Sequence, residues 1–128
     1  MKKVKSSKYH VVWTTKYRKP FLYGLIKYNV EKSIKYKSSK LNIKIEKMEI
    51  MPEHVHLFIE IPVTIPISKV VQELKGYSSY KTRKILNLYK YKKFWSRGYY
   101  CESVGCMSEN IIKKYIDNQW NKPNSSGD

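Results

Sequence analysis

The sequence is poor in several kinds of residue and pattern, and each shortage excludes a class of protein. Its only cysteines are Cys101 and Cys106, too few for a disulfide framework and without the second pair that a zinc site would need. No apolar run approaches the roughly 18 residues of a membrane span, and no hydrophobic stretch follows the N-terminal lysines. We therefore expect a soluble cytoplasmic protein with reduced thiols and no membrane partner.

Internal repeats and linker-like stretches are also missing from the chain. A length of 128 residues suits one domain that can bury a hydrophobic core without stabilising disulfide bonds. The polar stretch after Pro123 has the composition of an unstructured end. We expect a single domain over residues 1–122 and a disordered tail over residues 123–128.

Acidic residues are scarce, and this shortage gives the strongest global signal. Ten Asp and Glu stand against 26 Lys and Arg, so the formal net charge is +16. Such an excess favours a polyanionic partner. Tyrosines alternate with these cations in stretches such as "KGYSSYKTRK" and "LYKYKKFWSRGYY", a mixture typical of single-stranded nucleic acid binding. Any one of these lysines or tyrosines could equally be solvated or half-buried, so the signal belongs to the whole surface.

The hydrophobic periodicity predicts alternating strands and helices. Period-two patterns indicate strands over residues 7–15, 41–50, 54–62 and 96–104, with a bulge between Ile45 and Met48. Period-3.6 patterns indicate helices over residues 21–37, from Ile67 up to about Leu88, and from Ser108 onward. This order predicts an α+β fold, a two-layer ferredoxin-like or RRM-like antiparallel sheet with helices on one face and an additional C-terminal helix.

Two histidines stand one residue apart in "MPEHVHLFIEIP". On a strand, the side chains of His54 and His56 share a face. Their Cα atoms are roughly 7 Å apart, so both imidazoles can converge on one metal ion or one phosphate. A third ligand would have to come from elsewhere. His10 is one candidate, which keeps a three-histidine zinc hydrolase open.

The C-terminal helix offers a second candidate for the third ligand. Tyr115 and Gln119 are four residues apart and so project from one helical face. The amide oxygen of Gln119 could reach a metal while the phenol of Tyr115 stands beside it. The alternative is a purely structural role, in which Tyr115 packs in the core with the isoleucines on the same face of the predicted helix.

These motifs together resemble the single-tyrosine HUH transposases of the TnpA type, which move single-stranded insertion sequences. The similarity lies in the ordered set "YHVVWTTKYRKPFL", "MPEHVHLFIEIP", "SKVVQELKGYSSYKTRK", "FWSRGYYCESVG" and "YI..Q". It covers nearly the whole chain. One departure is "SVGCMSEN", where the family's connection is expected to be more polar.

The resemblance implies a role for each matching residue. His54, His56 and Gln119 would ligate a divalent metal, Mg²⁺ or Mn²⁺, and Tyr115 would be the catalytic nucleophile that forms a 5′-phosphotyrosine bond. The substrate would be single-stranded DNA with hairpin structure, handled by a homodimer with composite active sites. Such a protein would be associated with the nucleoid of a prokaryotic cell.

The predicted DNA contacts lie in two places. The basic turn after the first strand supplies four residues, and the second helix supplies two: Lys16, Tyr17, Arg18, Lys19, Lys75 and Arg83. Two alternatives to a transposase stay open, a domesticated relative that nicks chromosomal repeats and a non-catalytic RRM-like binder of single strands.

Overall fold

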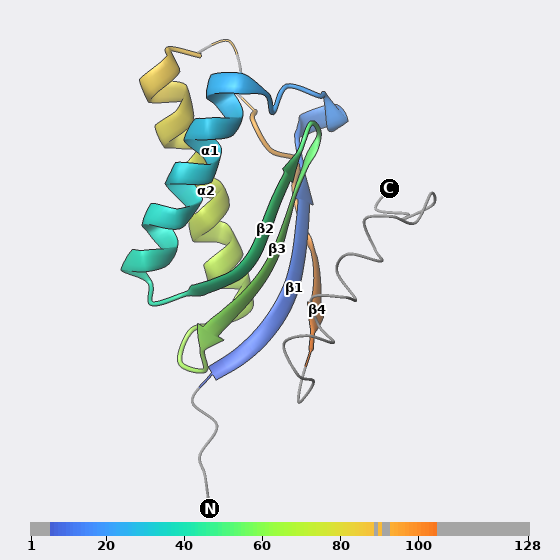
Figure 1. Cartoon of the computed structure of the whole chain (residues 1–128). Helices are drawn as coiled ribbons and strands as arrows, with labels where there is room; N and C mark the ends of the chain where they lie inside the picture. Colours follow the sequence, from blue (N-terminus) through green and yellow to red (C-terminus); the bar gives the residue numbers. More distant parts are fainter. Residues whose placement is uncertain (1–5, 89, 91–92, 105–128) are drawn as a thin grey trace, which may run out of the picture.

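The computed structural model describes residues 6–88, 90 and 93–104, which form one antiparallel sheet with two helices (Figure 1). The strands are β1 (Ser6–Thr14), β2 (Lys44–Met51), β3 (His54–Pro62) and β4 (Tyr100–Ser103), in the spatial order β2-β3-β1-β4. The helices are α1 (Gly24–Lys40) and α2 (Ile67–Leu86), with a short 3₁₀ turn, η1 (Lys16–Arg18), after β1. The α+β prediction is confirmed for these elements.

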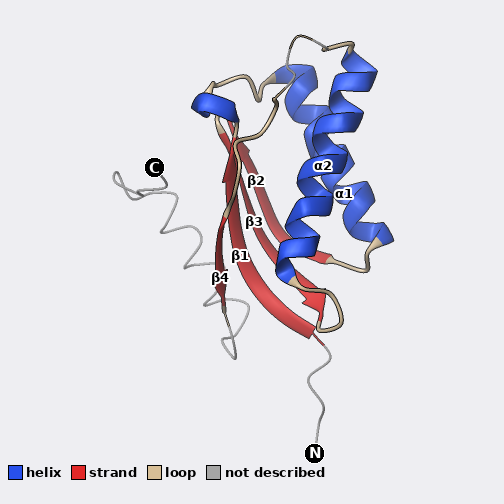
Figure 2. Cartoon of the chain, turned by 180° about the vertical axis from the view of Figure 1, so that it is seen from behind, coloured by secondary structure: helices blue, strands red, loops and turns tan. Residues whose placement is uncertain are grey.

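Both helices cover the same face of the sheet (Figure 2), and the sequence colours of Figure 1 show that they run antiparallel to each other. The alternation of each central strand decides which residues the helices bury. Val11 and Trp13 of β1, with Val55 and Leu57 of β3, are at most 1% exposed and pack with Val30, Ile34, Val70, Val71 and Leu74 of the helices. The opposite face of the sheet is therefore available for polar chemistry.

The predicted bulge is present in β2. Its register against β3 shifts between Ile45 and Lys47, so Glu46 is the extra residue of β2. That carboxylate is 3% exposed and lies 3.4 Å from the Lys44 ammonium and 4.0 Å from that of Lys8. The bulge thus places a paired acid beside β1.

The fourth strand is shorter than its sequence pattern predicts. The alternation suggests residues 96–104, whereas β4 begins at Tyr100. Gly98 has a φ of +80°, and Ser96 instead donates its N–H to the Thr14 carbonyl at 2.9 Å. The backbone between Ser96 and Tyr100 therefore bulges out of the ladder, and contact with the end of β1 resumes in an isolated bridge between Trp95 and Thr15.

The predicted helix over Ser108 onward, with Tyr115 and Gln119, and the predicted tail over 123–128 lie outside the described residues. Neither α1 nor α2 has the long apolar stretch that crossing a bilayer requires.

Candidate active site

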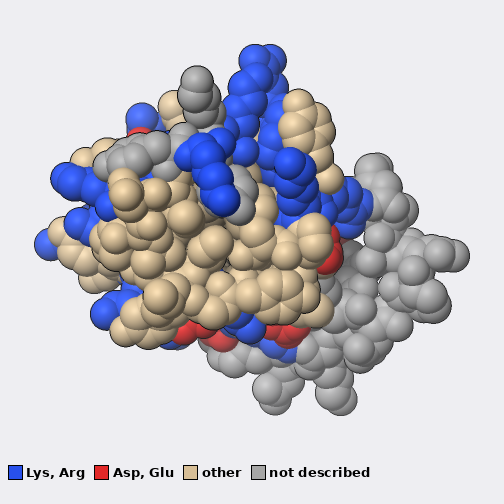
Figure 3. Space-filling model, turned by 90° about the horizontal axis from the view of Figure 1, so that it is seen from above, with Lys and Arg blue, Asp and Glu red and all other residues tan. Residues whose placement is uncertain are grey.

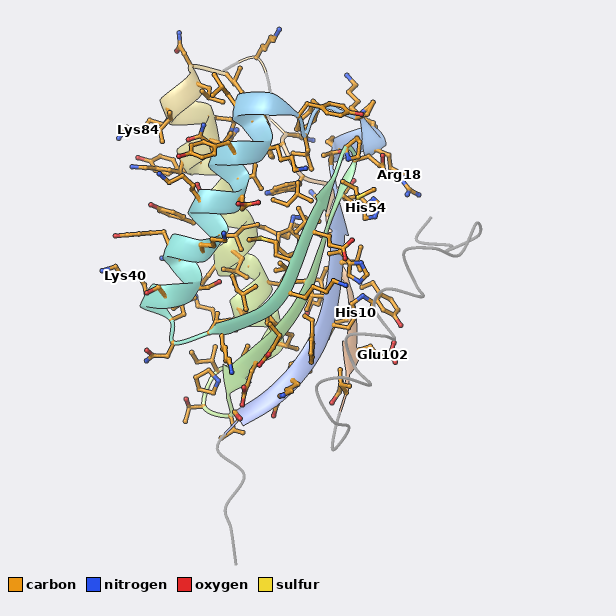
Figure 4. All side chains as sticks on the ribbon, in the orientation of Figure 1. His10, Arg18, Lys40, His54, Lys84 and Glu102 are labelled. Atoms are coloured by element: carbon orange, nitrogen blue, oxygen red, sulfur yellow. The ribbon has the colours of Figure 1, made fainter. Side chains whose placement is uncertain are left out.

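The candidate site lies on the sheet face opposite the helices. His54 and His56 both project there from β3, since Val55 between them and Leu57 after them are buried in the core on the other side. Figure 4 shows His54 and His10 on the side of the sheet turned away from α1 and α2. The predicted shared face of the two strand histidines is therefore confirmed in the geometry.

His54 is oriented by its neighbour in sequence. Its Nδ1 lies 2.7 Å from Oε1 of Glu53. A carboxylate only accepts, so Nδ1 carries the proton and Nε2 keeps its lone pair. Burial lowers the pKa of His54; Glu53 raises it and Arg18 lowers it further. His54 therefore presents a neutral Nε2, the form in which imidazole ligates a metal.

His56 is more deeply buried and contacts a histidine of the neighbouring strand. Its Nε2 meets Nε2 of His10 on β1, and the ring centroids lie 4.1 Å apart at 40°. Each side chain is about 3% exposed. Burial, above all, lowers the pKa of His10 to about 4 and that of His56 to about 3. Both rings are therefore neutral at physiological pH.

The edge strand β4 completes the surroundings of His10. The Tyr100 ring packs edge-on against the His10 ring at 5.9 Å, and the Tyr100 hydroxyl donates to Glu102 at 2.7 Å. Glu102 is paired with His10 in the β1–β4 register and raises its pKa against the effect of burial. Sequence reasoning missed Glu53, Tyr100 and Glu102. Only Glu53, which directly precedes the histidine strand, could have been suspected from its position.

The donor set fits a divalent ion in part. Two neutral imidazoles on one strand face suit such a metal. Within residues 6–88, 90 and 93–104, however, no group of three or more His, Cys, Asp or Glu side chains is placed to hold one. The structure brings His10 to His56 but does not assemble a three-histidine site. Gln119, the other third ligand considered from the sequence, lies outside the described residues.

The basic turn lies at the same end of the sheet as His54. Figure 3 views this end, on which more Lys and Arg than Asp and Glu are visible, and Figure 4 places Arg18 close to His54. Thr15 fixes the turn, since its N–H donates to the Glu53 carbonyl at 2.9 Å and its hydroxyl to the Lys19 carbonyl at 2.7 Å. These hydrogen bonds tie the turn to Glu53, the residue that precedes the histidine strand.

Two residues of this turn have an unusual backbone. Tyr17 and Arg18 have φ values of +57° and +53°, which costs on the order of 1 kcal/mol for each non-glycine residue. Tyr17 is nonetheless 76% exposed, with the Lys16 ammonium 5.0 Å from its ring centroid. Strain that presents an aromatic ring and cations to solvent is typical of a binding element.

The two predicted DNA contacts on α2 have partners within the protein. The Lys75 ammonium donates to the carbonyls of Ser96 and Gly98, both at 2.8 Å, and burial lowers its pKa. Arg83 donates through Nε to the Ser79 carbonyl at 3.1 Å. Lys75 therefore fastens the segment before β4 to α2, a role that sequence reasoning missed. Phosphate contacts by either residue stay predictions.

Known proteins share both the sequence and the fold. The family model described as "Transposase IS200 like" matches residues 3–119. The transposase for insertion sequence element IS200 of Salmonella typhimurium is 33% identical over 116 residues, covering 88% of this chain and 76% of the relative. The ISDra2 transposase TnpA of Deinococcus radiodurans is 28% identical over 121 residues, covering 89% of this chain and 84% of the relative.

Two solved structures resemble the fold. A crystal structure from Deinococcus radiodurans R1, assigned as a transposase, has a TM-score of 0.74 at 26% identity and covers 93% of this chain and 98% of its own. A REP-associated tyrosine transposase bound to a REP hairpin has a TM-score of 0.67 at 14% identity, covering 91% of this chain and 66% of its own; that likeness shows the fold alone. By sequence and structure, the chain belongs to the IS200-like transposase family.

Proposed function

We propose that this transposase is a metal-dependent endonuclease and strand transferase for single-stranded DNA. It would cleave beside a DNA hairpin and rejoin strands through a 5′-phosphotyrosine intermediate. The observation that carries the proposal is the pair of neutral imidazoles, His54 and His56, on the helix-free face of a central strand next to an exposed basic turn.

Each site residue has a distinct task in this proposal. His54 and His56, with Gln119, would hold Mg²⁺ or Mn²⁺, and Glu53 fixes the ring of His54 so that its Nε2 is the ligating atom. The bound ion would offset negative charge on the scissile phosphate. Burial lowers the pKa of both histidines, which reduces competition from protons for the ligating nitrogens.

Tyr115 would carry the covalent chemistry. Its phenolate oxygen attacks the phosphorus, the bond from phosphorus to the 3′ oxygen breaks, and that oxygen takes up a proton as a free 3′-hydroxyl. Rejoining reverses these bonds, with a 3′-hydroxyl attacking and the phenol leaving. One phosphodiester is exchanged for another, so no nucleotide cofactor is required.

The DNA would approach over the basic turn. Lys16, Arg18 and Lys19 supply cations for phosphates, and the exposed Tyr17 ring supplies a stacking surface for an unpaired base. A hairpin substrate is proposed by analogy with the REP-associated tyrosine transposase of similar fold, whose structure is bound to a REP hairpin. If the protein joins the cleaved strand to a second DNA end, it acts as a transposase and not as a relative that only nicks DNA.

A non-catalytic RRM-like binder fits the helix-free face less well. Such binders stack bases on exposed aromatic rings at the centre of the sheet. Here the central positions carry His10 and His56, and the one phenylalanine beside them, Phe58, has no exposed surface. The imidazoles favour metal chemistry at this place.

Incubation with hairpin-bearing single-stranded DNA and Mn²⁺ tests the proposal. We expect a covalent protein–DNA adduct that maps by mass spectrometry to Tyr115 and that Tyr115→Phe abolishes while DNA binding persists, because only the nucleophilic oxygen is removed. An adduct on Tyr99 or Tyr100 would refute the assignment of the nucleophile. No adduct and no cleavage with any single strand would refute the proposed function.

A further inference from the structure

The outer side of the helix layer carries three tyrosine–lysine pairs that the proposed function does not use. Each pair has i, i+4 spacing on one helix, with the ammonium 5.1 to 5.6 Å from the ring centroid. The tyrosines are 54%, 51% and 53% exposed. We refer to these residues together as the tyrosine–lysine face: Tyr28 with Lys32, Tyr36 with Lys40, and Tyr80 with Lys84.

The three pairs belong to one surface. Tyr36 of α1 stacks on Tyr77 of α2 with centroids 5.5 Å apart and ring planes at 24°, which fixes the two helices side by side. Because α1 and α2 run antiparallel (Figure 1), Tyr28 and Tyr80 lie in the same direction from this stack. Along the helix axes, Tyr28 lies roughly 12 Å from Tyr36, and Tyr80 lies roughly 4.5 Å from Tyr77, at 1.5 Å per residue. The exposed rings thus follow one another along the helix pair.

The surroundings of this face are strongly basic. The two helices contain ten Lys and Arg and only two acids, Glu31 and Glu73. Both acids already pair with lysines, Glu31 with Lys35 at 3.4 Å and Glu73 with Lys37 at 3.3 Å. Such a surface favours a polyanion.

The arrangement of rings and cations narrows the kind of polyanion. A duplex presents phosphates but hides the faces of its bases, so exposed tyrosine rings would gain nothing from it. An unpaired strand presents both, with bases that stack on rings and phosphates that meet ammonium groups. Every ring of this face has its own cation, which suits a single strand better than a duplex.

The tyrosine–lysine face also lies away from the histidines. Figure 4 shows Lys40 and Lys84 on the outer side of the helices and His10 and His54 beyond the sheet. A strand bound here is therefore not the segment being cleaved in the same subunit.

We propose that the tyrosine–lysine face is a second binding surface for single-stranded DNA, which holds unpaired nucleotides outside the segment at the active site. The inference rests on the proposed function only in taking DNA as the ligand, because it concerns binding and not cleavage. It adds that long single strands contact both sides of the molecule.

The test compares Tyr28→Ala/Tyr80→Ala with the matched variant Tyr28→Phe/Tyr80→Phe. Both rings are more than half exposed, so thermal melting should show that both variants fold. Fluorescence anisotropy measures binding to an unstructured strand of about 40 nucleotides and to one of about 12, the latter within the size of a single site.

We expect the alanine variant to bind the long strand about tenfold more weakly and the short strand within about twofold of wild type. The phenylalanine variant should bind both as wild type does, because stacking needs the ring and not the hydroxyl. Ultraviolet cross-linking of the long strand should map to Tyr28, Tyr36 or Tyr80 in the wild-type protein.

Three results would overturn the inference. They are an unchanged affinity of the alanine variant for the long strand, an equal loss for long and short strands, and an equal loss for a blunt duplex of the same length. Binding to anionic vesicles that the alanine variant loses, with DNA binding intact, would assign the face to a membrane instead. None of these results bears on the adduct at Tyr115, so the two proposals fail separately.

Discussion

His10 on β1 and His56 on β3 meet through their Nε2 atoms, although the register pairs His56 with Val12 and His10 with Phe58. The contact is therefore diagonal across the two central strands. It joins two imidazoles that burial keeps neutral, and it makes the stability of the sheet depend on pH.

Stability should fall as the solution is acidified from about pH 6.5 toward about pH 4. In the unfolded chain a histidine takes up a proton near its ordinary pKa of 6.5, whereas the folded pair resists protonation. Each ring thus lowers the free energy of unfolding by up to about 1.4 kcal/mol per pH unit. Urea unfolding measured across this range should show the slope, and His10→Gln/His56→Gln should flatten it. An identical slope in the variant would place the pH dependence elsewhere.

Removal of His54 or His56 should weaken Mn²⁺ binding more than removal of His10. Only the first two belong to the proposed ligand set, and loss of one ligand or its support typically costs about tenfold or more. Calorimetric titration of the three alanine variants decides the order. If His10→Ala weakens Mn²⁺ binding as much as His56→Ala does, a three-histidine site gains support.

Glu53→Ala should reduce Mn²⁺ affinity by about tenfold without removing any ligand, because His54 loses the carboxylate that fixes its Nδ1 proton. Glu53→Gln is the matched control, since its amide oxygen can still accept from Nδ1. Calorimetry should place this control between wild type and the alanine variant. Equal affinities for all three proteins would show that Glu53 does not orient the ligand.

Lys75→Met should destabilise the fold by about 1 to 3 kcal/mol, because two carbonyls lose a charged donor. Lys69→Met removes the same charge from the same helix at a position where the side chain is more than half exposed and its ammonium pairs with Glu73 at 3.5 Å, and should cost much less. Urea unfolding measures both. If instead the two variants are equally stable and only Lys75→Met weakens DNA binding, Lys75 acts as a phosphate contact.

Mixed dimers should reveal whether active sites are composite. Tyr115→Phe and His54→Ala/His56→Ala, each inactive alone, should regain cleavage when co-expressed if the tyrosine of one subunit serves the histidines of its partner. A purified heterodimer that cannot cleave would place both halves of the site in one chain. If light scattering shows a monomer at micromolar concentration, the proposed dimer is wrong.

Local patterns predicted most of the fold, because each central strand has one buried face and therefore a clear period of two. The same alternation placed His54 and His56 together and revealed the bulge near Ile45. The late start of β4 escaped prediction, since it depends on the bonds from Lys75 and Ser96, which join residues far apart in sequence.

The contact between His10 and His56 escaped prediction for a related reason. Periodicity gives the face on which a residue lies but not the diagonal neighbour that its ring reaches across a twisted sheet. The partners of His10 on β4 depend on strand order, which the sequence pattern leaves open.

The position of β3 between β1 and β2 determines how firmly His54 and His56 are held in the sheet. Its backbone amides bond to strands on both sides, whereas β4 pairs with β1 alone among the described strands. To expose His54 and His56, the hydrogen bonds of β3 to both β1 and β2 must break. In contrast, β4 can separate from β1 at a smaller cost in free energy. In hydrogen–deuterium exchange the amides of His56 and Leu57 should be among the last to exchange and those of β4 among the first, so that Tyr100 and Glu102 can leave His10 while the strand histidines stay in place.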